Sequence, residues 1–254
     1  MNNCYFLMIL IFLFLSCENE YGNSTKYPIK QTHSHDHSNG EDHDHSSDKA
    51  VEIKSSLKET LSQNSPDNSI YSSKNRSDWQ RPHLVINHLG NLEGKTLADI
   101  GAGPAGYFSA IIASETNVKK VIALDIDQDA LDFINKLATN NPKQLGGKIE
   151  TRLAESQNSK LKNNEADVIL ISNTLTYIED KISYLSKLRS SMPAGGRLVI
   201  VDYKMKEIPN MFPPSSERIP LYEMEQIVDN SGFKRIVSDD LTLQFQYVIV
   251  ALNP

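Results

Sequence analysis

A glycine-rich turn within residues 96–109, TLADIGAGPAGYFS, is the part of the sequence that points most clearly to ligand binding. An apolar stretch comes first, and Gly101, Gly103 and Gly106 follow it. Glycine has no Cβ, so it lets a backbone turn sharply and lie close to a ligand. Pro104 favours the first turn of a helix, where its missing N–H would have no partner in any case. The spacing predicts that a nucleotide-like cofactor binds over this turn.

Five of the seven histidines lie close together beside carboxylates, in an otherwise polar segment. They are His33, His35, His37, His43 and His45, and the neighbouring acids are Asp36, Asp42 and Asp44. Neutral imidazoles beside carboxylates form a ligand set that suits Zn²⁺, Cu²⁺ or Ni²⁺. Two interpretations stay open: weak, incidental metal binding by a solvated spacer, or a metal-capturing role.

The histidines belong to residues 17–75, a segment of mainly Asn, Ser, Asp, Lys and His with few large apolar side chains. Such a composition buries too little apolar surface to offset the chain entropy lost on folding. We therefore expect a flexible polar tether here.

The N-terminus, MNNCYFLMILIFLFLSC, has an apolar run over residues 5–15, which is shorter than the roughly 20 residues of a membrane-spanning helix. Its length is typical of a secretory signal peptide, which we expect over residues 1–16. The final FLSC resembles a bacterial lipobox, in which cleavage precedes a cysteine that carries acyl chains. We therefore expect Cys17 to be lipidated and the protein to be anchored to a membrane of the bacterial cell envelope. The alternative is an uncleaved hydrophobic segment, which would leave the protein cytoplasmic.

Stepwise alternation of strand and helix patterns over residues 76–254 predicts one α/β domain that positions the turn. Expected strands cover residues 95–100, 119–125, 148–152, 166–172 and 197–203. Expected helices cover residues 77–89, 104–115, 128–140, 180–191 and 220–231, the last followed by Gly232 as a C-terminal cap. Residues 233–252 have the pattern of two antiparallel strands with a turn at Asp239–Asp240. These elements predict a parallel sheet with helices on both faces and a closing hairpin.

The charge pattern excludes one class of partner. The net charge is −6 and no Lys/Arg cluster lies on any expected helix, so the electrostatic footprint of a nucleic-acid-binding protein is missing. We therefore expect no DNA or RNA partner.

Residues 76–254 resemble the class I S-adenosylmethionine (SAM) dependent methyltransferases. The matching segments are ADIGAGPAGYFS at the turn, VIALDID, DVILISNTLTYIED and MPAGGRLVIVDY. The resemblance implies a Rossmann-like, doubly wound seven-stranded sheet in the order 3-2-1-4-5-7-6, with strand 7 antiparallel. It also implies that SAM is the cofactor and that a methyl group passes to an acceptor. The sequence identifies neither the acceptor nor the oligomeric state.

The resemblance assigns roles around the turn. Asp99 would face the methionine moiety of SAM, often through water, and its charge would favour a cationic cofactor. Gly101, Ala102, Gly103 and Gly106 would form the turn under the cofactor. The alternative for Asp99 is a carboxylate that caps the next helix.

Four further residues are implied on the exits of later strands. Asp125, about 20 residues past the last glycine, would accept hydrogen bonds from the ribose hydroxyls. Ile126 would pack on one face of the adenine, and Glu155 would meet the adenine amino group. Asn173 would support both cofactor and acceptor. The alternatives are a helix cap for Asp125, a solvated carboxylate for Glu155 and a turn residue for Asn173.

Two departures from the family pattern keep other functions open. The turn is spelled G-x-G-x-x-G instead of G-x-G-x-G, and no histidine follows the fourth strand. The first departure matches the fingerprint of an NAD(P)-dependent oxidoreductase, although the charge of Asp99 would repel a pyrophosphate. A non-catalytic or metal-handling envelope lipoprotein is the other alternative. No catalytic residue can be named, and the Pro-rich residues 207–219 are expected to cover the substrate pocket.

Overall fold

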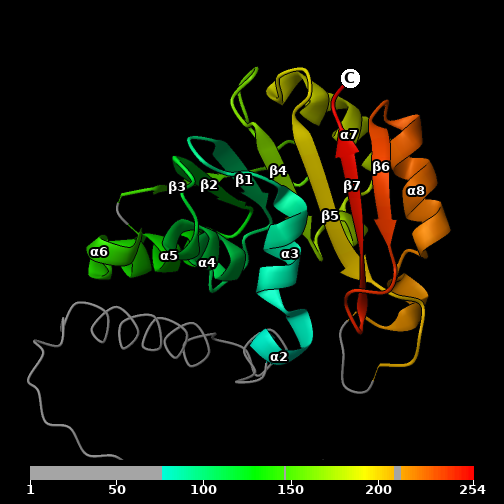
Figure 1. The fold of residues 1–254 in the computed structure, drawn as a ribbon, viewed down its shortest axis with the longest axis horizontal. Helices are drawn as coiled ribbons and strands as arrows, with labels where there is room; N and C mark the ends of the chain where they lie inside the picture. Colours follow the sequence, from blue (N-terminus) through cyan, green and yellow to red (C-terminus); the bar gives the residue numbers. More distant parts are fainter. Residues whose placement is uncertain (1–75, 146, 209–212) are drawn as a thin grey trace, which may run out of the picture. The chain divides into compact units, whose positions relative to one another are not determined.

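The computed structural model describes residues 76–145, 147–208 and 213–254 (Figure 1). The expected signal peptide, Cys17, the tether and its five histidines lie outside the described residues. None of the helices in the described ranges has the length and apolar character that crossing a membrane requires.

A single seven-stranded sheet forms the centre of the domain (Figure 1). Its strands are β1 (Thr96–Ile100), β2 (Lys120–Asp125), β3 (Ile149–Leu153), β4 (Val168–Ser172), β5 (Arg197–Tyr203), β6 (Lys234–Asp239) and β7 (Gln246–Leu252). Their order is β3-β2-β1-β4-β5-β7-β6. β7 pairs antiparallel with both β5 and β6, whereas the other neighbours are parallel. The expected fold class and strand order are therefore confirmed.

Helices cover both faces of the sheet because successive strand residues point to opposite sides. One face buries Leu97 of β1 against α3 (Pro82–Leu89) and α4 (Tyr107–Glu115). The opposite face buries Ala98 against α7 (Lys181–Leu188) and α8 (Leu221–Asn230). α5 (Gln128–Asn140) packs on β2 through Leu131 and Ile134, on the α4 side.

The leading helix differs from the expectation. Instead of one helix over residues 77–89, the chain forms α2 (Arg76–Gln80) and α3, which are separated at Arg81. Arg81 has a φ of 45°, in the left-handed region. Pro82 accounts for the break between the two helices, because a proline ring disfavours the right-handed α conformation of the residue before it. The break gives α2 its own direction relative to α3 (Figure 1).

α5, α7 and α8 follow their sequence signals closely. α5 has the expected bounds, and Asp127 caps it by accepting a hydrogen bond from the Asp129 N–H. Asp180 caps α7 by accepting from the Ser183 N–H. α7 is followed by a short 3-10 helix, η3 (Arg189–Ser191), and the four-residue α6 (Pro142–Leu145) was not expected. Two further 3-10 helices are η2 (Leu175–Tyr177) and η4 (Ser215–Glu217).

The closing hairpin has the expected polar turn. Asp239 Oδ1 accepts hydrogen bonds from the N–H groups of Leu241 and Thr242, each at 2.9 Å. This arrangement stabilises the connection between β6 and β7.

Candidate functional site

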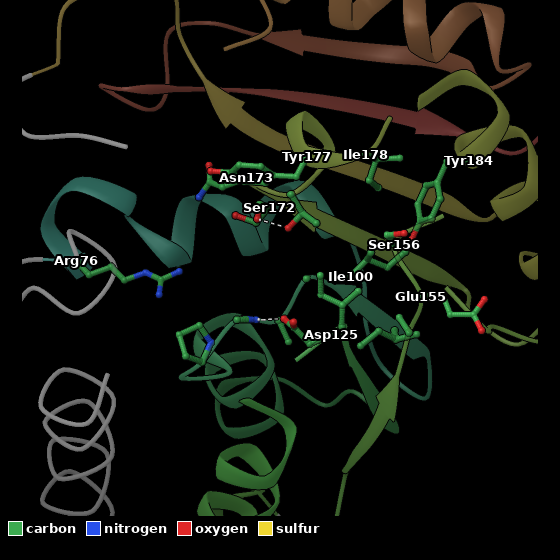
Figure 2. A pocket seen from close by; sticks show the side chains of 18 residues that line it. Arg76, Ile100, Asp125, Glu155, Ser156, Ser172, Asn173, Tyr177, Ile178 and Tyr184 are labelled. Carbon is green, nitrogen blue, oxygen red and sulfur yellow. Dashed lines mark hydrogen bonds between the residues drawn. The ribbon is translucent and has the colours of Figure 1, made fainter. Parts of the chain in front are cut away.

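A cavity of about 330 Å³ opens at the carboxyl ends of β1, β2 and β4 (Figure 2). Its walls come from α2, the β1–α4 turn and the segments that follow β2, β3 and β4. The lining residues include Arg76, Gly101, Ala102, Gly103, Pro104, Asp125, Ile126, Glu155, Ser156, Ser172, Asn173, Tyr177, Ile178 and Tyr184. Connections leave β1 and β4 toward opposite faces of the sheet, and this switch point is where open α/β sheets bind ligands.

Close contacts require glycine at two of the three glycine positions of the turn. Gly101 has a φ of +74°, and a Cβ there would lie 2.1 Å from Thr174 Oγ1. Gly106 has a φ of +55°, and a Cβ there would lie 2.6 Å from Ile134 Cγ1. A Cβ on Gly103 would meet nothing within 4 Å, and this residue lines the cavity. Gly106 is absent from the lining, so it serves the packing of α4 on α5.

The G-x-G-x-x-G turn has one residue more than the G-x-G-x-G pattern, and residues 103–106 accommodate it by forming a β-turn. The Gly106 N–H donates to the Gly103 carbonyl at 3.1 Å, which places Pro104 at the position that proline favours in such a turn. Ala105 is buried in the core. α4 therefore begins at Tyr107, and the expectation that Pro104 starts the helix was wrong.

Hydrogen-bond donors of the turn are used within the protein. The N–H groups of Gly101 and Ala102 both donate to the Leu124 carbonyl, at 2.8 and 3.0 Å. The Gly103 N–H donates to Asp125 Oδ2 at 2.8 Å. Dinucleotide sites bind pyrophosphate through such N–H groups. With these donors already engaged, the turn lacks the cradle that a pyrophosphate needs.

Asp125, the last residue of β2, lines the cavity. Besides the bond from Gly103, its Oδ1 accepts from the Asp127 N–H at 3.1 Å. A carboxylate has about four acceptor positions, so two remain for donors in the cavity. Asp127, not Asp125, caps α5. The contact with the ribose hydroxyls that the resemblance implied for Asp125 stays a prediction.

Asp99 lies behind the turn and does not line the cavity. Its side chain is buried and accepts a hydrogen bond from Ser109 Oγ of α4 at 2.7 Å. Burial raises the pKa of Asp99 to about 6, the Ser109 hydroxyl opposes this rise, and the charge of Asp125 adds to it. The N-cap of α4 is Gly106, so Asp99 does not cap that helix. Its proposed contact with the methionine moiety stays a prediction.

At the far end of the cavity, apolar and polar groups gather around the place implied for adenine. Ile126 lines the cavity with 65% of its surface exposed. Glu155 lies at the rim, and its carboxylate pairs with Lys160 Nζ at 2.6 Å and points away from the cavity (Figure 2). Ser156 and Tyr184 lie together on this side (Figure 2), and neither was identified from the sequence.

Asn173 connects the exit of β4 with β7. It has a φ of 55°, and its Oδ1 accepts from Gln246 Nε2 at 2.6 Å. Gln246 is fully buried, and its Oε1 has no hydrogen-bond partner among the described residues. Asn173 therefore takes its conformation from a tertiary contact, which a local turn motif would not provide.

Tyr177 lines the cavity with 55% of its surface exposed. Burial, and then the charges of Asp202 and Glu217, raise the pKa of Tyr177. Asp202 is the second-last residue of β5, is buried, and has a pKa raised by burial to about 7. Among the described residues, no group of three or more His, Cys, Asp or Glu side chains could hold a metal ion.

The chain is similar to known methyltransferases at the level of sequence. A family model described as a methyltransferase domain matches residues 91–240. Ribosomal RNA small subunit methyltransferase A of Rhodopseudomonas palustris is 41% identical over 61 residues, which are 24% of this chain and 21% of that protein. Phosphoethanolamine N-methyltransferase 3 of Arabidopsis thaliana is 22% identical over 163 residues, 61% of this chain and 32% of that one. The matches thus span about a fifth and a third of these relatives.

Solved structures share the fold. A SAM dependent methyltransferase from Aquifex aeolicus superimposes with a TM-score of 0.62 at 20% identity, covering 81% of this chain and 98% of that one. The [4+2]-cyclase SpnF gives a TM-score of 0.61 at 12% identity, covering 81% and 94%. Because the family model matches more than half of the sequence, this chain belongs to the methyltransferase domain family.

Proposed function

We propose that this protein is a SAM-dependent methyltransferase. The observation that carries the proposal is Asp125, whose carboxylate keeps two acceptor positions in a cavity bordered by a glycine turn. Ribose hydroxyls match those positions, and the engaged N–H groups of the turn disfavour the pyrophosphate of NAD(P). Antiparallel β7 also differs from the dinucleotide-binding sheet.

The residues of the site can bind and align the reactants without an acid or base. When bound, SAM supplies a sulfonium methyl group to a nucleophilic acceptor, and the carbon–sulfur bond breaks as the new bond forms. Asp125 would hold the ribose, and Gly103 would allow close approach of the cofactor. Tyr177 would border the acceptor. Alignment of two reactants can supply roughly 7–11 kcal/mol of the barrier reduction.

Calorimetric titration of the full-length chain with S-adenosylhomocysteine (SAH), and separately with NAD, tests the cofactor. We expect SAH to bind and NAD to give no heat. Binding of NAD alone, or of neither compound at millimolar concentration, would refute the proposal.

A protein that keeps the fold without transferring a methyl group is the second candidate. The similarity to a [4+2]-cyclase supports it, because the same fold can host other chemistry. Incubation with radiolabelled SAM and cell extract separates the two: labelled product supports transfer, whereas binding of SAH without any labelled product supports the second candidate.

We also propose that Cys17 anchors the protein to the bacterial envelope and that the five tether histidines bind Zn²⁺, Cu²⁺ or Ni²⁺. The lipobox-like FLSC and the His/Asp alternation support these proposals. Metabolic labelling with a fatty acid tests the anchor, and label retained after Cys17→Ser would refute it. Zinc titration of the full-length chain, with and without the five histidines replaced by alanine, tests the metal site; equal affinities would refute it.

A further inference from the structure

Exposed apolar side chains gather at one end of the domain. Among the described residues, eight large apolar side chains are exposed, and seven of them lie at the edge where the parallel strands end. Ile126 and Tyr177 line the cavity itself. The other five, which we call the apolar rim, are Leu153, Ile182, Met205, Tyr222 and Leu241.

The topology places all five rim residues at this edge. Leu153 ends β3, and Met205 follows the end of β5. α7 connects β4 to β5, and α8 connects β5 to β6, so each helix begins where the preceding strand ends; Ile182 and Tyr222 are their second residues. Leu241 lies in the turn after β6, which points the same way as β5 because both are antiparallel to β7 (Figure 1).

An ion pair joins two of the segments that carry the rim. Lys204 Nζ lies 3.3 Å from Asp240 Oδ1, which brings the exits of β5 and β6 together. Met205 and Leu241 directly follow these two residues in the chain. Because the two charges balance each other, the apolar side chains should dominate any contact that this part of the edge makes.

The distribution of the exposed apolar side chains is what calls for an explanation. Single exposed apolar side chains are common on protein surfaces, whereas a group of them around one opening marks an interaction site. Leu241 has 93% of its surface exposed, and Tyr222 has 65%. Within the described ranges, the opposite edge, where the parallel strands begin, exposes no large apolar side chain. The rim is therefore confined to the end at which the cavity opens.

The sequence that precedes the described domain indicates what meets this edge. Residues 1–75 join the domain at Arg76, which lines the cavity and so lies at the same edge as the rim (Figure 1). They include the apolar run over residues 5–15 and the lipobox-like FLSC that ends at Cys17. A covalent link to a lipid anchor raises the effective concentration of the domain at the membrane. Stable membrane attachment generally needs a second contact besides one acyl chain.

We propose that the apolar rim docks on the surface of a lipid bilayer, with the cavity opening toward the lipid. The choice of partner rests on the anchor proposed for Cys17. The strength of such docking grows with the apolar area that enters the boundary between headgroups and acyl chains. Leu241 supplies a fully apolar side chain, and Tyr222 has a ring and a hydroxyl that suit the level of the headgroups.

Fluorescence quenching by lipid tests which edge faces the bilayer. In the full-length chain, Cys4→Ser and Cys17→Ser remove the native thiols, and one new cysteine at a time carries an environment-sensitive fluorophore. Leu241→Cys places it in the rim, whereas Asn117→Cys and Ala194→Cys place it at exposed residues of the opposite edge. Phosphatidylcholine vesicles with doxyl-labelled acyl chains should quench the rim label at least about twofold, because a docked face reaches the acyl boundary. The two labels at the opposite edge should keep their intensity.

Partitioning onto phosphatidylcholine vesicles tests whether the rim side chains carry the binding. In the same thiol-free full-length chain, Tyr222→Ser combined with Leu241→Ser should weaken partitioning about 10- to 100-fold, because two apolar side chains no longer leave water. Ile236→Ser is the matched control, since Ile236 is the one exposed large apolar residue of the described chain that lies within a strand, away from the rim. It should leave partitioning within about twofold of its value before the change.

Three outcomes would overturn the inference. The labels at the two edges could be quenched alike, or the double variant could partition as Ile236→Ser does. Sedimentation without vesicles could instead show a dimer that the double variant loses, which would make a second copy of the chain the occupant of the rim. None of these measurements involves SAH or the lipid on Cys17, so the proposed methyltransferase function and the proposed anchor stand or fall by their own tests.

Discussion

Replacing Asp202 by asparagine should remove a loss of stability that occurs as the pH rises. The Asp202 side chain is buried at the end of β5, and its Oδ2 has no hydrogen-bond partner among the described residues. Burial raises its pKa from 3.8 to about 7, although the Tyr203 N–H and the charges of Lys181 and Arg218 oppose this rise. The folded protein therefore keeps a proton on Asp202 that the unfolded chain has already released.

The sign and size of the effect follow from this difference. Between pH 4 and pH 7 the Asp202 side chain binds more protons in the folded state than in the unfolded state, so its contribution to the free energy of unfolding falls as pH rises. The stabilisation is fully present below the unfolded pKa of 3.8 and is lost as pH passes about 7. At about 1.4 kcal/mol for each pKa unit, the loss amounts to about 4 kcal/mol.

Urea unfolding of wild type and Asp202→Asn at pH 4, 6 and 8 measures this loss. The stability of the variant relative to the wild type should rise by about 4 kcal/mol from the lowest to the highest pH. Asp99, whose pKa is also raised, contributes equally to both proteins and cancels. Asp132→Asn, at an exposed residue of α5, is the control and should show no such trend. A pH-independent difference between wild type and Asp202→Asn would refute the reasoning.

Three further changes test the site and its supports. Gly101→Ala should lower the free energy of unfolding by about 3 kcal/mol, because its Cβ would overlap Thr174. Gly103→Ala should lower it by only about 1 kcal/mol, because only its positive φ is unfavourable for alanine. Urea titration of both variants checks this order. Asp125→Asn should weaken SAH binding about 10-fold or more in calorimetry, because it removes the charge that strengthens hydrogen bonds from the ribose. The pKa of Glu165 is lowered to about 2, chiefly by hydrogen bonds from Arg152, so the stability it contributes is present above its ordinary pKa of 4.5 and is lost as pH falls toward 2. The stability gap between wild type and Glu165→Gln should therefore shrink between pH 5 and pH 3 in thermal unfolding, and a constant gap would contradict this assignment.

The elements of the sheet could be predicted because the sequence signals that specify them are local. Apolar strands, capping aspartates and the polar turn at Asp239 each act within a few residues, and the family resemblance supplied the strand order. The break between α2 and α3 was missed, although Pro82 carries a local signal for it. The burial of Asp99 beside α4 also had a signal, because alternation along β1 places it on the same face as Leu97.

Other parts of the site depend on contacts between distant segments, which no local pattern encodes. Gln80, which accepts a hydrogen bond from Arg76 at the cavity, itself donates to Ser172, 92 residues away along the chain. Asn173 takes its conformation beside Gln246, 73 residues away. The pair of Asn173 and Gln246 becomes visible only when β4 and β7 have been placed on either side of β5. The glycine turn and Asp125, by contrast, lie on adjacent strands with short connections, so sequence spacing located them.

The glycine spacing by itself left the cofactor class ambiguous, and hydrogen bonding of the turn reduces that ambiguity. A G-x-G-x-x-G turn binds pyrophosphate when its N–H groups face the ligand. Here Pro104 and Ala105 lie inside a β-turn in which the Gly106 N–H donates to the Gly103 carbonyl. The Gly103 N–H donates to the Asp125 carboxylate. The same carboxylate that would bind the ribose thus also occupies a donor that a pyrophosphate would need. A ligand with hydroxyl donors at its centre fits this turn, and one with a central dianion does not.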